Sequence, residues 1–170
     1  MERRVVITGM GAITPIGNNV DELWQGIEEK KCGINKITSF DATGYKTSLA
    51  AEIKNYNASD YFDLKQAKRL DKCSQYAIIA AREAFIDSKI TKENTDFERI
   101  GVFVGSGIGG LKTIQDQCEV YLKKGHNRIS PMFIPMSICN MPAGNIAIEL
   151  GLKGESISTV SACSTSTHSI

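Results

Sequence analysis

The residue with the greatest chemical potential in this sequence is Cys163, which stands where a β-like run gives way to small polar residues. Residues 156–160 are typical of a buried strand, and Ser164, Thr165 and Ser166 suit the start of a helix. A thiol at such a strand-to-helix corner faces backbone N–H groups, which favour its reactive thiolate form. The pattern therefore predicts a nucleophile. The alternative is a small buried hydrophobic residue at the end of a central strand.

The groups that could assist this thiol are few. The N–H of Cys163 could form part of an oxyanion hole, and Ala162 is small enough to let a substrate carbonyl approach. His168 follows five residues later, which on a helix places it about 140° around the axis from the thiol. We therefore expect His168 to be structural, and we expect His126 to lie exposed in a polar loop. The sequence offers a nucleophile without a convincing base.

A second motif, the glycine-rich run at residues 105–110, matches the pattern G-x-G-x-x-G literally. It follows a β-like run and precedes a helical one, as in dinucleotide-binding proteins, where the glycines cradle a pyrophosphate. However, this is not the first strand of the chain, and residues 123–128 are basic where an acidic residue is expected. A tight turn at which the backbone passes close to another segment is the favoured interpretation, and an oxidoreductase stays a remote alternative.

Composition narrows the class of protein further. The chain has 170 residues, 42% of them hydrophobic, and a formal net charge of +1, which is typical of one soluble globular domain and does not favour nucleic acid as a partner. Apolar stretches are too short for a membrane span, and the start does not read as a signal peptide, so we expect a cytoplasmic protein. Five cysteines without a C-x-x-C pair, together with two histidines, indicate free thiols and no metal site.

The elements that must position these residues alternate between short β-like runs and helical periods, which predicts an α/β fold. Small residues line one face of the long helix, so we expect it to pack closely against a sheet. We predict strands at residues 4–8, 48–53, 100–104 and 156–160. The first predicted helix runs from the N-cap Asn19, with Glu22 as its capping-box partner, to Gly33. We predict further helices over residues 65–88 and 111–122 and from Pro142 to Gly151, and a loop over residues 123–137.

Taken together, several segments resemble one family, the elongating type II β-ketoacyl-acyl carrier protein synthases of the thiolase-like superfamily. The resemblance spans essentially the whole chain and corresponds to less than half of a full member. One departure is Ser166, where the family often has glycine. The segments are 5–11 (VVITGMG), 69–77 (RLDKCSQYA), 105–110 (GSGIGG), 128–135 (RISPMFIP), 161–163 (SAC) and, more loosely, 140–144 (NMPAG).

The resemblance implies a fold and an assembly. Residues 1–170 would form an amino-terminal β-ketoacyl synthase domain, with a mixed sheet flanked by helices, in a protein that forms homodimers. Because a strand that feeds a new helix does not normally stop after about two turns, we expect the domain to be incomplete at Ile170.

The resemblance also assigns roles to individual residues. Cys163 aligns with the cysteine that accepts the acyl group, while ordinary packing is the alternative for its apolar neighbours. A cysteine that carries an acyl chain needs an apolar channel, which favours pocket roles. The positions that align with the acyl pocket, its gate or the segment near the dimer interface are Gly107, Ile108, Phe133, Ile134, Ser137 and Ala162.

The activity implied is a decarboxylative Claisen condensation between an acyl group on Cys163 and a malonyl-carrier thioester, without a cofactor or metal. Acyl carrier protein would be the partner, docking on a basic surface for which Lys123, Lys124 and Arg128 are candidates. In the family the catalytic histidines belong to the carboxy-terminal half, so we expect no condensation from these 170 residues alone. A polyketide-type ketosynthase and a catalytically incomplete, non-catalytic ketosynthase module remain alternatives.

Overall fold

Two units make up the part of the chain that the computed structural model describes, residues 4–170. Unit 1 comprises the chain up to Asn57 together with Ile79–Lys89, and unit 2 comprises Ala58–Ile78 and Ile90–Ile170. All the sequence-predicted site residues belong to unit 2.

Unit 1 contains helix α1 (Val20–Glu28) and a hairpin of two short antiparallel strands, β1 (Ile34–Lys36) and β2 (Leu49–Ala51). Asn19 caps α1 as predicted, because its Oδ1 accepts the N–H of Glu22 at 2.8 Å. The Glu22 carboxylate accepts the N–H of Asn18 at 2.8 Å, so the reciprocal bond of the capping box reaches one residue further than predicted.

The predicted end of this first helix at Gly33 is wrong. The helix stops at Glu28, and Lys30 adopts a left-handed backbone with φ 54°. The N–H groups of Lys30 and Lys31 donate to the carbonyls of Ile27 and Gly26, which is the Schellman pattern that closes a helix. A lysine therefore occupies the position where sequence rules look for glycine.

The small-residue face of helix α3 (Lys72–Asp87) serves a close contact within unit 1. A Cβ added at Gly11 would lie 1.8 Å from the carbonyl oxygen of Ala80, and one added at Gly9 would lie 2.2 Å from that of Ala84. The segment after residue 8 thus passes over the helix at a separation that only glycine allows. The helix packs closely, as predicted, but against an extended segment.

Glu83 of α3 ties two further backbone groups of unit 1 to the same helix. Its carboxylate accepts the N–H of Ala12 at 2.9 Å and the N–H of Val20, in the first turn of α1, at 2.8 Å. One side chain therefore fixes both the segment before α1 and the start of α1, where unpaired N–H groups need an acceptor.

Two other element predictions fail. Residues 4–8 form no strand, and Val5 is 93% exposed, because a strand needs a partner and no neighbouring strand pairs with this run within residues 4–170. The predicted long helix is two helices, α2 (Leu64–Ala67) and α3, because Asp71 acts as a second N-cap: its Oδ1 accepts the N–H of Cys73 at 2.9 Å.

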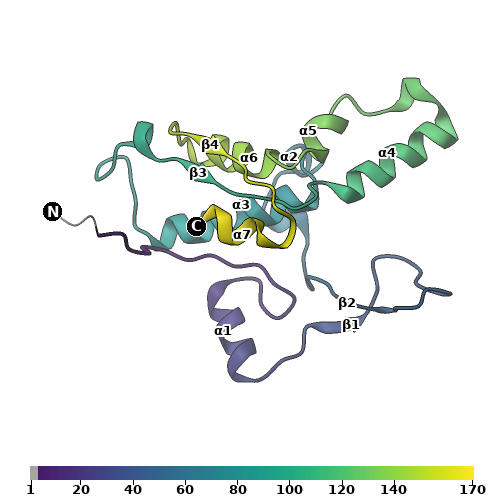
Figure 1. Cartoon of the computed structure of the whole chain (residues 1–170), viewed down its shortest axis with the longest axis horizontal. Helices are drawn as coiled ribbons and strands as arrows, with labels where there is room; N and C mark the ends of the chain where they lie inside the picture. Colours follow the sequence, from purple (N-terminus) through teal and green to yellow (C-terminus); the bar gives the residue numbers. More distant parts are fainter. Residues whose placement is uncertain (1–3) are drawn as a thin grey trace. The chain divides into compact units, whose positions relative to one another are not determined.

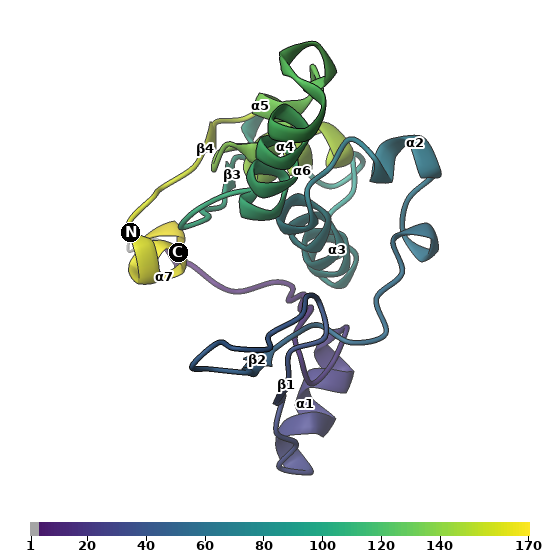
Figure 2. The same cartoon turned by 90° about the vertical axis from the view of Figure 1, so that its right-hand side faces the viewer.

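Unit 2 is built on a parallel pair of strands, β3 (Val102–Phe103) and β4 (Ser156–Ile157), in which Val102 lies opposite Ser156. Helix α6 (Met141–Leu150) contacts both strands, and Figures 1 and 2 show it beside them. Pro142 lies in its first turn and Gly151 follows it at φ 67°, both as predicted. The buried apolar residues of this unit include Phe62, Ile78, Val102, Ala143 and Ile146.

The predicted loop over residues 123–137 is only partly correct. Helix α4 (Leu111–Lys124) extends into it, and Phe133–Ser137 forms the short helix α5. Pro135 does not prevent α5, because proline is tolerated in the first turn of a helix, where no intrahelical N–H bond is lost. The α/β class is confirmed, with its antiparallel and parallel pairings in two separate sheets.

The hairpin of unit 1 holds a carboxylate that should make its stability depend on acid. Glu52 accepts hydrogen bonds from the side chain of Ser39, from the Thr38 hydroxyl at 2.7 Å, and from the backbone N–H groups of Thr38 and Ser39, and these bonds lower the pKa of Glu52 to about 2. Because the pKa of Glu52 in the folded state lies below its ordinary value of 4.5, the ionised carboxylate stabilises the fold at pH values above about 4.5. This stability is lost as the pH falls towards 2.

We therefore predict that Glu52→Gln flattens the dependence of the unfolding temperature on pH between about 4.5 and 2, with the largest loss of stability at pH 6. Thermal unfolding at a series of pH values measures this, and Glu155→Gln, which removes an exposed carboxylate of unit 2, is the control. Equal pH profiles for Glu52→Gln and the parent protein would contradict the prediction.

Candidate functional site

Cys163 lies in a 3₁₀ turn (Ala162–Ser164) between the extended segment that follows β4 and the short helix α7 (Thr165–Ser169). Figure 2 shows α7 at the end of this segment, so the thiol stands at the strand-to-helix corner that the sequence predicts. The side chain is exposed and makes no disulfide. An exposed thiol contradicts the alternative of a buried core cysteine.

The backbone of this turn is held in a conformation that side chains disfavour. Ala162, directly before the thiol, has φ 51°, in the left-handed region. The N–H of Ser161 donates to the hydroxyl of Thr165 at 2.9 Å, and Thr165 is buried. Such conformations persist where surrounding contacts impose them, and they concentrate at functional sites. The small size of Ala162 is evident from its residue type, whereas its left-handed backbone and the hydrogen bond of Ser161 are not.

The glycine-rich loop packs directly against this turn. A Cβ added at Gly105 would lie 2.1 Å from Cγ2 of Thr165 and 2.4 Å from the carbonyl oxygen of Thr159. At Gly107 the nearest atom would be the carbonyl oxygen of Ala162, at 3.4 Å. The space beside the first glycine is therefore filled by the protein itself, as expected for a tight turn at a close backbone crossing.

The other end of the loop contacts α5. Gly109 has φ 82°, and a Cβ there would lie 2.3 Å from the carbonyl oxygen of Ser137, which also accepts the N–H of Gly110 at 2.9 Å. The glycine-rich loop thus joins the turn that contains Cys163 to the helix that contains Phe133, Ile134 and Ser137.

The predicted apolar pocket residues differ in their surroundings. Ile108 is 62% exposed and Ile134 is 57% exposed, whereas Phe133 is half-buried. Ser137 is buried, and its hydroxyl donates to the carbonyl of Ile134 at 3.2 Å within α5, which is a structural role. The structure brings the loop and α5 together, and an acyl channel lined by these side chains stays a prediction.

Asp71 is an organising residue that is absent from the sequence-predicted site. Its buried carboxylate accepts the hydroxyl of Thr113 at 2.6 Å and the N–H of Thr113 at 3.2 Å, in addition to the N–H of Cys73. It therefore joins the first turns of α3 and α4 next to Gly110, whose added Cβ would lie 2.9 Å from the same carboxylate. An aspartate just before a helical run is the signal that could have identified it.

Asp71 also affects the reactivity of Cys73, which differs in its surroundings from Cys163. Burial, followed by the charge of Asp71 and a hydrogen bond to it, raises the pKa of Cys73 to about 11. At neutral pH Cys73 is therefore a thiol and a poor nucleophile, because the thiolate is the reactive form. Exposure and the strained turn distinguish Cys163 from it.

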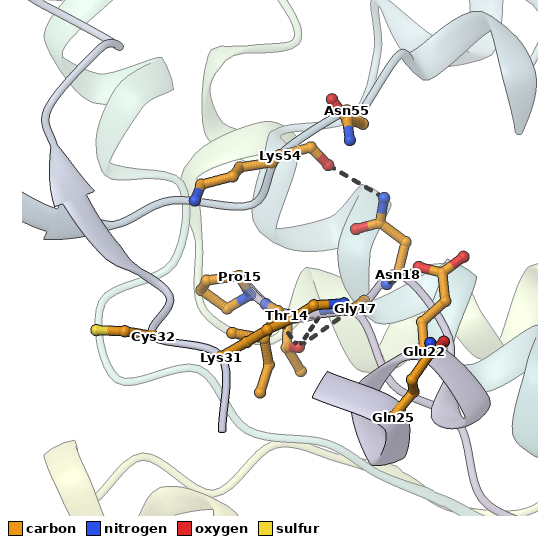
Figure 3. A pocket seen from close by; sticks show the side chains of 11 residues that line it. Thr14, Pro15, Gly17, Asn18, Glu22, Gln25, Lys31, Cys32, Lys54 and Asn55 are labelled. Carbon is orange, nitrogen blue, oxygen red and sulfur yellow. Dashed lines mark hydrogen bonds between the residues drawn. The ribbon is translucent and has the colours of Figure 1, made fainter. Parts of the chain in front are cut away.

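A cavity of about 410 Å³ lies elsewhere, in unit 1, among the loops that flank α1. Figure 3 shows Asn18 in it, with its side-chain amide donating to the carbonyl of Lys54 at 3.1 Å, and Thr14 bonded across its own turn to Gly17. None of the sequence-predicted site residues lines this cavity.

Across residues 4–170, no cluster of three or more histidine, cysteine or acidic side chains is placed to hold a metal ion. Over the same residues, every helix is too short or too polar to cross a bilayer.

Comparison with known proteins identifies the family. The sequence model of a protein family, described as the β-ketoacyl synthase N-terminal domain, matches residues 2–170. A 3-oxoacyl-[acyl-carrier-protein] synthase 2 from Staphylococcus aureus (strain N315) is 47% identical over 168 residues, which are 99% of this chain and 41% of that protein. The chain thus spans about two fifths of the length of this curated relative.

Solved structures agree on the fold. The ishigamide ketosynthase/chain length factor superimposes with a TM-score of 0.80 at 27% identity, over 94% of this chain and 40% of that one. A type II polyketide ketosynthase, bound to the hexaketide and in complex with its acyl carrier protein, gives a TM-score of 0.78 at 21% identity over 99% of this chain and 44% of that one, which shows the fold alone.

These matches confirm the resemblance on which the sequence analysis drew. The segments that carry it include the turn that contains Cys163 and the glycine-rich loop, which the structure places in contact. The thiolase-like fold class is likewise confirmed, and the dinucleotide-binding alternative has no support from this fold. The chain belongs to the β-ketoacyl synthase family, and residues 2–170 match the model of that family's N-terminal domain.

Proposed function

We propose that this chain supplies the acyl-accepting nucleophile of a 3-oxoacyl-[acyl carrier protein] synthase, an elongating condensing enzyme of fatty acid synthesis. The observation that carries the proposal is the exposed thiol of Cys163 on a left-handed turn that the glycine-rich loop packs against. The similarity to the staphylococcal 3-oxoacyl-[acyl-carrier-protein] synthase 2 supports the reaction class.

In the first half-reaction, the thiolate of Cys163 attacks the carbonyl carbon of an acyl thioester on the carrier. Backbone N–H groups, including that of Cys163, stabilise the oxyanion that forms. The carbon–sulfur bond to the carrier then breaks, the carrier thiolate leaves and takes up a proton, and the acyl group stays on Cys163. One thioester replaces another, so the step is nearly balanced in free energy.

In the second half-reaction, a malonyl-carrier thioester loses carbon dioxide, and the resulting enolate attacks the acyl carbonyl on Cys163. A new carbon–carbon bond forms, the Cys163 thiolate is released, and the product is a 3-oxoacyl-carrier thioester. Decarboxylation supplies the driving force, so the scheme requires no redox cofactor or metal. The histidines that would stabilise the enolate belong, by the family resemblance, to the carboxy-terminal half of the enzyme. This chain covers 41% of the length of its relative.

The pocket, the assembly and the location belong to the same proposal. Gly107, Ile108, Phe133 and Ala162 would border the acyl chain near the thiol, and Ile134 and Ser137 would lie near the interface of a homodimer. A cytoplasmic location suits the free thiols.

Acyl carrier protein is the proposed partner, and a structural relative solved in complex with its own carrier protein supports it. The candidate docking residues lie at the end of α4 and just after it. Lys124 and Arg128 are exposed, while Lys123 pairs with Glu119 at 3.0 Å. Lys65, Lys68 and Arg69, exposed in and just after α2, add further cations to unit 2. An acidic carrier would be attracted to such a surface.

The experiment that tests the nucleophile is acyl transfer. We predict that a protein of full family length containing this chain, mixed with octanoyl-carrier thioester alone, gains one octanoyl group on the peptide that contains Cys163, measured by mass spectrometry. Cys118→Ala, which removes another exposed thiol, should keep this label. Labelling at Cys118 or Cys32 to the same extent as at Cys163 would overturn the proposal.

A polyketide-type ketosynthase is the second candidate, favoured by the structural likeness to the ishigamide ketosynthase/chain length factor. The two differ in their products. With acyl-carrier and malonyl-carrier thioesters, an elongating synthase releases the product of one condensation, whereas a polyketide enzyme continues to a longer poly-oxo chain. Mass spectrometry of the carrier-bound products distinguishes them.

A further inference from the structure

Ser161, two residues before Cys163, binds helix α7 through both its backbone N–H and its side-chain hydroxyl. Its N–H donates to the hydroxyl of Thr165 at 2.9 Å, and its own Oγ lies 2.6 Å from Nδ1 of His168. Thr165 and His168 are three residues apart in α7, so they share one face of the helix. The two contacts form a clamp on Ser161, and the helical spacing of His168 relative to Cys163 does not reveal it.

The helix that provides the clamp is itself anchored. Thr165 is 3% exposed, and its methyl group fills the space beside Gly105. The hydroxyl of Ser169 donates to the carbonyl of Thr165 at 3.1 Å and lies 3.0 Å from the hydroxyl of Thr159. These bonds anchor α7 to the segment that follows β4, so the two residues that bind Ser161 belong to a helix that is itself held in place.

The clamp acts on the strained part of the turn. Ala162, between Ser161 and Cys163, has φ 51°, a conformation that an alanine leaves unless its neighbours hold it. Rotation at Ala162 changes the direction of both the Cys163 side chain and the Cys163 N–H. A clamp on the preceding residue therefore controls where the thiol and the proposed oxyanion donor point.

We propose that His168 is a positioning residue of the condensing reaction, which through its bond to Ser161 holds the nucleophile turn in its left-handed form. The inference rests on the proposed function of Cys163 and adds a residue to it. His168 does not act as a base on the thiol here. Because geometric precision of about 1 Å at a reacting atom is worth up to about 100-fold in rate, loss of the clamp should lower kcat more than it changes KM.

The test uses a protein of full family length that contains this chain, with four variants. His168→Leu removes the hydrogen bond at similar size, and His168→Asn keeps a polar atom near the position of Nδ1. Ser161→Ala breaks the same bond from the other side, and the double variant combines Ser161→Ala with His168→Leu. Thr167→Val, on an exposed position of α7, is the control.

We expect His168→Leu and Ser161→Ala each to lower kcat, and the rate of octanoyl transfer to Cys163, by about 10-fold to 100-fold, with KM within about twofold. The double variant should be no slower than the slower single variant, because both remove one interaction. His168→Asn should recover most of the rate, and Thr167→Val should match the parent protein.

Three results would overturn the inference: a parental kcat in His168→Leu, losses that multiply in the double variant, or no recovery in His168→Asn. If His168→Leu does not fold, as judged by its thermal unfolding, Ser161→Ala decides the question on the same readouts. Failure of the proposed function is seen separately, because Cys163→Ala would then keep full activity. A parental His168→Leu beside an inactive Cys163→Ala overturns only the positioning role.

Discussion

Cys163→Ala is expected to abolish condensation, lowering kcat by about a thousandfold or more in a protein of full family length that contains this chain. The reason is that the acyl group cannot form a thioester with the protein without the sulfur, so no acyl-enzyme is present to react with the malonyl-carrier. Because the Cys163 side chain is exposed, its removal should leave the unfolding temperature nearly unchanged, as for most surface substitutions. The measurement is the rate of 3-oxoacyl product formation from acyl-carrier and malonyl-carrier thioesters, followed by mass spectrometry.

Two controls make this result specific to the thiol at that position. Cys118→Ala removes a second exposed cysteine, on α4, and should keep the parental rate. Cys73→Ala removes the half-buried thiol of high pKa and should act only through stability. An active Cys163→Ala, or an inactive and fully folded Cys118→Ala, would show that the acyl carrier residue lies elsewhere.

The second large effect is expected from Gly105→Ala. The new methyl group would lie 2.1 Å from Cγ2 of Thr165 and 2.4 Å from the carbonyl oxygen of Thr159, and one of these is backbone. Overpacking of this kind costs about 1–3 kcal/mol and moves the segments apart. Since Thr165 also binds Ser161, the shift should reach the nucleophile turn and lower activity as well as stability. Thermal unfolding and the condensation rate measure the two effects.

The chain provides a matched control within the same unit. A Cβ at Gly144, in helix α6, meets nothing within 4 Å, so Gly144→Ala should stabilise the protein by about 0.5–1 kcal/mol through its helix preference. Adding Thr165→Ser to Gly105→Ala removes the clashing methyl but keeps the hydroxyl, and should recover part of the loss. Equal stability of the Gly105→Ala and Gly144→Ala proteins would contradict the geometry.

The roles of the glycines illustrate how far sequence patterns reach. The G-x-G-x-x-G spelling is shared by phosphate-binding loops and by turns that pass close to another segment, because both need a backbone without side chains. Only the neighbours distinguish them. Here the atoms next to Gly105 and Gly109 belong to Thr165 and to Ser137 of α5, residues distant in the sequence.

The local chemistry of this protein was readable from the sequence. Asn19 as a cap, Pro142 and Gly151 as the bounds of α6, and Cys163 at a strand-to-helix corner all follow from preferences that act within a few residues. The family itself is evident because its motifs recur along the whole chain. These features depend on covalent neighbours, so the linear order of residues is sufficient.

The tertiary structure alone decided the features that depend on distant segments. Residues 4–8 look like a strand but have no strand partner within residues 4–170, Asp71 joins two helices through Thr113, and His168 reaches Ser161 across the turn that holds Cys163. The left-handed backbone of Ala162 has no signature in its own residue type. Each arises because packing brings donors, acceptors and surfaces together at separations that local preference does not specify, and packing outweighs that preference.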